Sequence, residues 1–266
     1  MKKLVFILCC ISGLSFGQEA KYLSQSFEFK SGETAYLFGD QVKLREAPNT
    51  ASEVLALLGI GEAIEILEKT DSHMTYEGMK SPWYKVKYKE KVGFVLGGLI
   101  SMDKATYRDQ TYLVALKEDK GTFYLKTRVM GKEEGYIENV SALYTHAFSI
   151  KAYGNRGLQD LEGIFLVNYI SESCGVDGGG IYLFHTGNSL LEAIRFSRVA
   201  DADLYWFIEE YIFPFDESGK RNKILYKREE GSTLEYETEW KETKIIQRLL
   251  EWKDNQVLPK IDFKEN

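Results

Sequence analysis

The sequence has few prolines and, beyond its first ten residues, a single cysteine. Four prolines in 266 residues, together with 14% aromatic residues, indicate packed β-sheet and exclude a disordered or proline-rich stalk. Cys9 and Cys10 lie in an N-terminal apolar run, and only Cys174 follows it. One cysteine cannot form an intrachain disulfide, so hydrophobic cores must stabilise the folded part.

Long apolar runs and excess positive charge are also missing. After residue 17 no stretch approaches the 18 or more apolar residues of a membrane span, so no membrane span is expected. The whole chain carries a formal charge of −6, and without residues 1–17 it has 32 basic against 40 acidic residues, a charge of −8. This balance argues against nucleic acid as a partner.

The N-terminus has the pattern of a secretory signal. Lys2 and Lys3 precede an apolar run, Leu4–Leu14, and Ser15-Phe16-Gly17 places small residues where a signal peptidase cleaves. We therefore expect residues 1–17 to be a signal peptide and the mature chain to begin at Gln18, in the periplasm or outside the cell. A lipoprotein signal is disfavoured, because Cys9 and Cys10 lie too early in the apolar run.

Short alternating runs follow a polar arm at residues 18–33. Gln41–Arg45 and Ala63–Glu68 alternate apolar with polar residues, as half-buried strands do, and Glu46–Thr50 interrupts them with turn-forming residues. Lys69–Pro82 is read as a long polar loop. About five short strands within residues 34–103 predict a small closed β-barrel.

This segment resembles the bacterial SH3 (SH3b) domains. The resemblance rests, in order along the chain, on Val42, Leu44, Arg45, Pro48, Val54, Leu58, Gly61, Ile64, Ile66, Trp83, Tyr84, Val86, Gly93, Phe94 and Val95. It implies an SH3-like barrel that binds a peptide, protein or cell-wall ligand. The Lys69–Pro82 segment is longer than the usual connection, so we expect a reshaped groove beside it. The alternative is that the barrel acts as a spacer or packs against its neighbour.

Strand alternation suggests the ligand-binding residues. Lys85 and Lys87 should face water, which places Trp83 on the same outer face and Tyr84, Val86 and Tyr88 inside. Phe94 should then lie outward beside Trp83. We predict a ligand groove formed by Trp83, Phe94 and the loop carboxylate Glu46, which would select basic or amine groups. The alternative is that the arm or the second domain covers these rings.

Residues 104–266 predict a second, β-rich domain of antiparallel strands, with room for one or two helices. The strand candidates are Thr111–Leu116, Phe123–Val129, Ile164–Ile170, Ile181–Phe184, Lys223–Tyr226 and Leu234–Trp240. The run from Leu204 to Ile212 has helical spacing but strand composition, and Ile245–Trp252 is similarly ambiguous. Asp177–Gly180 and Asp254-Asn255 are predicted as hairpin turns.

Catalytic patterns are weak. Glu172-Ser173-Cys174-Gly175, with His146 or His185 as base, is the best candidate, but no helix pattern follows Cys174 as it does in the NlpC/P60 peptidases that accompany SH3b modules. We therefore interpret Cys174 as a structural thiol.

The patterns for metal binding and for paired catalytic acids are weaker than the cysteine pattern. A metal site from His146, Cys174, Asp177 and His185 lacks paired short-range ligands, so no metal and no cofactor is expected. His73 is expected at the surface. Paired acids such as Glu209-Glu210 and Glu229-Glu230 are expected to be solvated.

Two hypotheses of function remain. The one we favour is an exported, non-catalytic binding protein of the bacterial envelope. The alternative is an envelope hydrolase whose active site lies in residues 104–266 and would show a cleft that brings Cys174 to a histidine.

Overall fold

The computed structural model describes residues 21–130, 135–145, 147–170, 178–201, 205–235 and 240–261. Within these ranges the chain is almost entirely antiparallel β-structure in three sheets, and the one helical element is a 3₁₀ turn, η1 (Gly97–Leu99). The predicted fold class, mainly β with an N-terminal SH3-like unit, is confirmed. No helix in the described part of the chain is long and apolar enough to cross a membrane.

The first sheet is the barrel. Its strands follow the order β4-β3-β7-β6-β5-β2-β8, with bounds β2 (Thr34–Leu37), β3 (Val42–Arg45), β4 (Val54–Leu58), β5 (Ala63–Tyr76), β6 (Met79–Tyr88), β7 (Lys91–Leu96) and β8 (Ile100–Ser101). Tyr84 and Val86 point into its buried core together with Leu44, Ile64 and Ile66, as the alternation predicted. Burying large apolar side chains at about 25 cal/mol per Å² is what holds so small a unit together.

The second sheet has four strands in the order β12-β11-β10-β9, with bounds β9 (Asp103–Tyr107), β10 (Gln110–Asp119), β11 (Thr122–Met130) and β12 (Tyr136–Ala142). In β11 the buried residues alternate, namely Leu125, Thr127 and Val129, because this face of the sheet covers a core. On the other face Lys126 and Arg128 are partly buried, since the barrel packs against that side.

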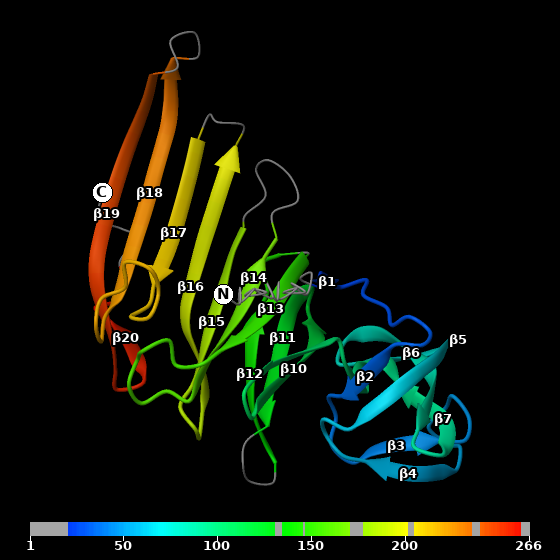
Figure 1. Cartoon of the computed structure of the whole chain (residues 1–266). Helices are drawn as coiled ribbons and strands as arrows, with labels where there is room; N and C mark the ends of the chain where they lie inside the picture. Colours follow the sequence, from blue (N-terminus) through cyan, green and yellow to red (C-terminus); the bar gives the residue numbers. More distant parts are fainter. Residues whose placement is uncertain are drawn as a thin grey trace, which may run out of the picture.

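The third sheet is a long meander that curls into a half-barrel (Figure 1). Its order is β1-β13-β14-β15-β16-β17-β18-β19-β20, with bounds β1 (Leu23–Ser24), β13 (Ala147–Tyr153), β14 (Gly163–Tyr169), β15 (Gly178–His185), β16 (Leu190–Asp201), β17 (Tyr205–Ile212), β18 (Ile224–Glu235), β19 (Trp240–Lys253) and β20 (Gln256–Leu258).

The ambiguous segments of the sequence all resolve as strand. The run with helical spacing is β17 from Tyr205 on, while Leu204 lies outside the described residues, and Ile245–Trp252 lies within β19. Asp254-Asn255 forms the predicted hairpin turn, with φ of 52° and 60°. The candidate strand Leu234–Trp240 is not one strand, because β18 ends at Glu235 and β19 begins at Trp240.

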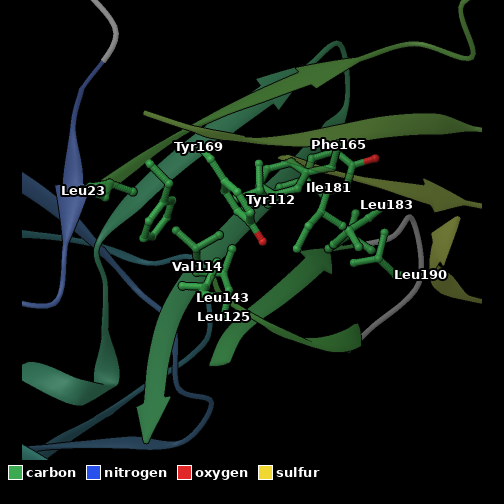
Figure 2. Close-up of a cluster of buried hydrophobic side chains, with 13 residues drawn as sticks. Leu23, Tyr112, Val114, Leu125, Leu143, Phe165, Tyr169, Ile181, Leu183 and Leu190 are labelled. Carbon is green, nitrogen blue, oxygen red and sulfur yellow. The ribbon is translucent and has the colours of Figure 1, made fainter. Parts of the chain in front are cut away.

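The four-stranded sheet packs on one face of the nine-stranded sheet. Figure 2 shows this core, where Tyr112 and Val114 of β10 meet Phe165 of β14 and Leu183 of β15. A second core lies on the opposite face of the nine-stranded sheet and contains Tyr182, Phe184, Phe213 and Tyr226 among others. Strand β15 is buried on both faces, which explains why Ile181–Phe184 is continuously apolar in the sequence.

The glycine run Gly178–Gly180 is not a hairpin turn but the beginning of β15, and Asp177 lies outside the described residues. A Cβ atom at Gly179 would lie 2.1 Å from the carbonyl oxygen of Phe196, and one at Gly180 would lie 2.2 Å from that of Val167. The glycines therefore allow close approach of the neighbouring strands. The prediction of a hairpin turn at this glycine run is wrong for that reason.

The barrel is joined to the four-stranded sheet by packing and by charge. Phe38 packs with Leu113 and Ala115 of β10, and the Arg128 side chain donates a hydrogen bond of 2.6 Å to the Phe38 carbonyl oxygen. The N-terminal arm links the barrel to the nine-stranded sheet as well. Leu23 of β1 pairs with Phe148 of β13, while Phe29 packs on the ring of Tyr84 in the barrel.

Candidate functional site

A groove of about 260 Å³ crosses the surface of the barrel. Its apolar lining comes from five elements of the unit, and the residues are Val42, Met74, Tyr76, Trp83, Leu96 and Leu99. Strands β3, β5, β6 and β7 carry five of these residues, and the turn η1 carries the sixth. A concave apolar surface with a few polar groups at its margin is the usual form of a ligand site.

Trp83 lies in this groove, although less openly than predicted. Register places it opposite Leu96, while Lys85 lies opposite Phe94, so Trp83 does share a sheet face with Lys85. The expectation of an exposed ring is nevertheless wrong, because Trp83 is only 4% exposed. Side chains of the neighbouring strands cover most of the ring, so Trp83 both forms the floor of the groove and contributes to the packed interior of the barrel.

The segment Lys69–Pro82 is a continuation of two strands rather than a polar loop. Strands β5 and β6 extend past the barrel as a hairpin, closed by a two-residue turn at Glu77-Gly78. The hairpin carries Met74 and Tyr76 into the groove, so the extra length relative to the resembled pattern reshapes the groove as expected.

The ring of Tyr76 packs closely against the backbone of the barrel at Gly98. A Cβ atom at Gly98 would lie 2.6 Å from the Tyr76 ring, so the contact requires glycine. Burial is the main cause that raises the pKa of the Tyr76 hydroxyl, with a smaller contribution from the carboxylate of Glu77. Tyr76 therefore stays protonated at neutral pH and presents a neutral hydroxyl beside the groove.

The charged groups along the groove are mainly basic. Lys43 and Arg45 of β3 and Asp40 before it line the groove. Arg45 donates a hydrogen bond of 2.8 Å to the carbonyl oxygen of Ser52, and Asp40 accepts one of 3.3 Å from the amide of Ile60, so both are committed to neighbouring loops. Lys43 is exposed, which leaves its ammonium group directed to solvent.

The other two residues of the predicted site lie beside the groove. Phe94 is half-buried and pairs with Arg45 across β7 and β3, and Glu46 is exposed in the turn that follows β3. Among the described residues that line the groove, neither Phe94 nor Glu46 is present. The preference for basic ligands that was assigned to Glu46 therefore has no support from the lining.

The sequence-based search missed Met74, Tyr76, Leu96 and Leu99. The unusual length of the Lys69–Pro82 segment was the one signal pointing toward the first two. Alternation along β7 could have placed Leu96 on the face of Phe94, since the two residues are two positions apart.

Of the catalytic and metal candidates, the structure describes only His185. His185 is buried at the end of β15, whereas His146, Cys174 and Asp177 lie outside the described residues. Across the described ranges, no group of three or more His, Cys, Asp and Glu side chains is placed to hold a metal ion. His73 is exposed, as predicted.

One acid of the pairs expected to be solvated is buried. Glu209 is 2% exposed, and its carboxylate accepts hydrogen bonds of 2.8 Å from the Ser197 amide and from the Tyr226 hydroxyl. Burial and this carboxylate together raise the pKa of the Tyr226 hydroxyl well above its ordinary value. Glu209 therefore satisfies donors inside the half-barrel, a structural role that residue counts alone could not reveal.

Comparison with known families agrees with the barrel. Residues 40–101 match the family described as bacterial SH3 domain, which confirms the resemblance noted from the sequence. No curated protein and no solved structure was found to match the chain.

Proposed function

We propose that this protein is an exported, non-catalytic binding protein of the bacterial envelope, which recognises a peptide or cell-wall ligand through the groove of its SH3 domain. The groove itself carries the proposal, because it combines an aromatic floor, Tyr76 and Trp83, with a basic margin. Bacterial SH3 domains often bind peptidoglycan or peptides, which supports this class of ligand. The order of charged, apolar and small residues in 1–17 supports export.

The lining suggests what the ligand presents to the groove. Flat aromatic rings held by their neighbours offer contact area at little cost in conformational entropy. Of the charged groups along the groove, only the Lys43 ammonium is directed to solvent rather than bound to a loop. A ligand with an apolar segment and a nearby carboxylate, such as an acidic peptide or a peptide C-terminus, fits this arrangement better than one with an amine.

The test compares two exposed lysines of the barrel. Lys43 lines the groove, whereas Lys87 on β6 does not. Because Lys43→Glu and Lys87→Glu change the net charge equally, a difference in binding between them reports on the groove. Co-sedimentation with isolated peptidoglycan, and calorimetry with the soluble peptides released from it, should show binding by the unmodified protein. Lys43→Glu should weaken that binding about fivefold or more and reduce its dependence on salt, because a marginal charge acts mainly through electrostatic attraction.

Lys87→Glu should bind as the unmodified protein does. Equal binding by the two variants, or no binding of peptidoglycan or its peptides by the unmodified protein, would show that the groove is not the site for this ligand.

A further inference from the structure

Phe215 is the most exposed large hydrophobic side chain that the structure describes, at 81%. It lies in the loop between β17 and β18, on the side of the molecule away from the barrel (Figure 1). An exposed aromatic ring on a mobile loop would need no explanation. This ring is on a hydrogen-bonded turn, so its exposure is a fixed feature of the surface.

Hydrogen bonds and ion pairs hold the turn that carries Phe215. Arg156 forms a two-pronged ion pair with the carboxylate of Asp216, and that carboxylate also accepts a hydrogen bond of 2.7 Å from the amide of Phe213. The amide of Phe215 donates to the carbonyl oxygen of Arg156 at 3.1 Å. Gly157, with φ of 87°, lies directly beneath the ring, and a Cβ atom there would come within 2.7 Å of it. The ring is therefore held in place before any ligand arrives.

Phe215 separates two hollows. One, of about 500 Å³, lies between the β9–β10 turn, the segment after β13 and Phe215. The other, of about 480 Å³, lies between the segment after β13 and the β17–β18 loop. Asn155 and Phe215 line both, so the hollows adjoin along the ring. Each falls within the roughly 300–1,000 Å³ usual for small-ligand sites.

Polar side chains line both hollows beside the aromatic rings. Amide groups come from Gln110, Asn155, Gln159 and Asn222, and the first hollow has two acids, Asp109 and Glu162, against Arg108 and Arg156. Arg156 is already paired with Asp216. The other formal charges are Arg108 and Arg221 against Asp109 and Glu162, so they cancel over the two hollows and leave no strong preference for an ion of either sign. In the first hollow the ring of Tyr107 lies over Gly154, which adds a second aromatic surface beside Phe215.

We propose that these two hollows form a binding site for a neutral oligosaccharide, whose chain crosses the ring of Phe215 with a sugar unit on each side. A pyranose ring offers a flat C–H face that packs on an aromatic ring, and hydroxyl groups that both donate and accept hydrogen bonds. Amide, carboxylate and guanidinium groups supply the matching donors and acceptors. A protein partner would need a broad apolar centre around Phe215.

The experiment measures binding of neutral hexasaccharides of glucose, N-acetylglucosamine, mannose and galactose to the intact protein by calorimetry. At least one should bind, and Phe215→Ala should weaken its binding about tenfold or more. Because Phe215 is exposed, this variant should keep the unfolding temperature of the unmodified protein. Tyr22→Ala, at an aromatic side chain that is 67% exposed and outside both hollows, is the matched control and should bind normally.

Two further variants locate the bound chain. Arg221→Ala, in the second hollow, should weaken the hexasaccharide more than the corresponding trisaccharide, because a shorter chain can bind without reaching that hollow. Binding by none of the four sugars, or equal binding by Phe215→Ala, would overturn the proposal. If Lys43→Glu in the barrel abolished sugar binding instead, the sugar would belong to the barrel groove and this second site would be rejected, without affecting the test with peptides.

Discussion

At the scale of single residues, Trp83 shows how burial changes the expected effect of a substitution. From the sequence, Trp83→Ala should weaken ligand binding by about 2 kcal/mol with little loss of stability. Because Trp83 is 4% exposed, we now expect the free energy of unfolding to fall by about 3–5 kcal/mol, as for other large core side chains replaced by alanine. Urea unfolding checks this, with the exposed Lys87→Ala on the same strand as control, expected within about 0.5 kcal/mol of the unmodified protein.

His185 gives a prediction about pH. Burial lowers the pKa of its imidazole, and this effect outweighs the nearby carboxylate of Glu162, which acts in the opposite direction. The unfolded chain, with a histidine pKa of about 6.5, therefore binds more protons than the folded one. The stability due to neutral His185 is complete above about pH 6.5 and is lost as the pH falls from there toward the folded pKa.

The measurement is the free energy of unfolding between about pH 5 and pH 8. The difference between the unmodified protein and His185→Gln should shrink as the pH falls below about 6.5. The exposed His73→Gln serves as control and should follow the unmodified protein throughout. A difference for His185→Gln that does not change with pH would contradict the assignment.

At the scale of elements, the extended β5–β6 hairpin has two roles. Its side chains Met74 and Tyr76 line the groove, and its tip contacts the four-stranded sheet. At the tip, the amide of Glu118 donates a hydrogen bond of 2.8 Å to the carbonyl oxygen of Glu77, whose carboxylate pairs with Lys126. Glycine is required at Gly78, where a Cβ atom would lie 2.0 Å from the Glu118 carbonyl oxygen.

Two equivalent hairpin turns allow a matched test of this contact. Glu77-Gly78 has φ of 51° and 81°, and Lys120-Gly121 has φ of 51° and 80°, but nothing lies within 4 Å of a Cβ atom at Gly121. Gly121→Ala should cost only the backbone strain, about 1 kcal/mol. Gly78→Ala should cost at least about 1 kcal/mol more, because the hairpin tip must also move away from the sheet. Equal losses in thermal unfolding would show that the tip contact contributes nothing.

At the scale of the whole molecule, we expect the full chain to be exported and processed. The reason is the order of Lys2, Lys3, the apolar run and Ser15-Phe16-Gly17. When the full-length gene is expressed in a Gram-negative host, the intact mass of protein from the periplasm or medium should match a chain that begins at Gln18. Protein that keeps residues 1–17, or that carries an added diacylglycerol, would refute this expectation.

Much of the fold could be predicted because its signals are local. Alternation along β3, β5 and β6 showed which residues lie in the barrel core, with Trp83 as the exception, since successive side chains of a strand point to opposite faces. The ordered apolar and glycine positions of residues 40–101 were enough to indicate the bacterial SH3 domain. The local pattern failed at Gly178–Gly180, where neighbouring strands approach closely, and it left β17 undecided because its apolar spacing also fits a helix.

The sequence by itself determined the β-rich class and the position of the barrel, and it singled out Trp83, which lines a groove of the barrel surface. Only the tertiary structure decided that Trp83 is buried, that Met74 and Tyr76 join it, and that Phe94 and Glu46 lie to the side. It also decided that Glu209 is internal and that Phe215 separates two hollows. The physical reason is that burial and grooves depend on which distant strands and loops meet, whereas periodicity reports only the face of a strand on which a side chain lies.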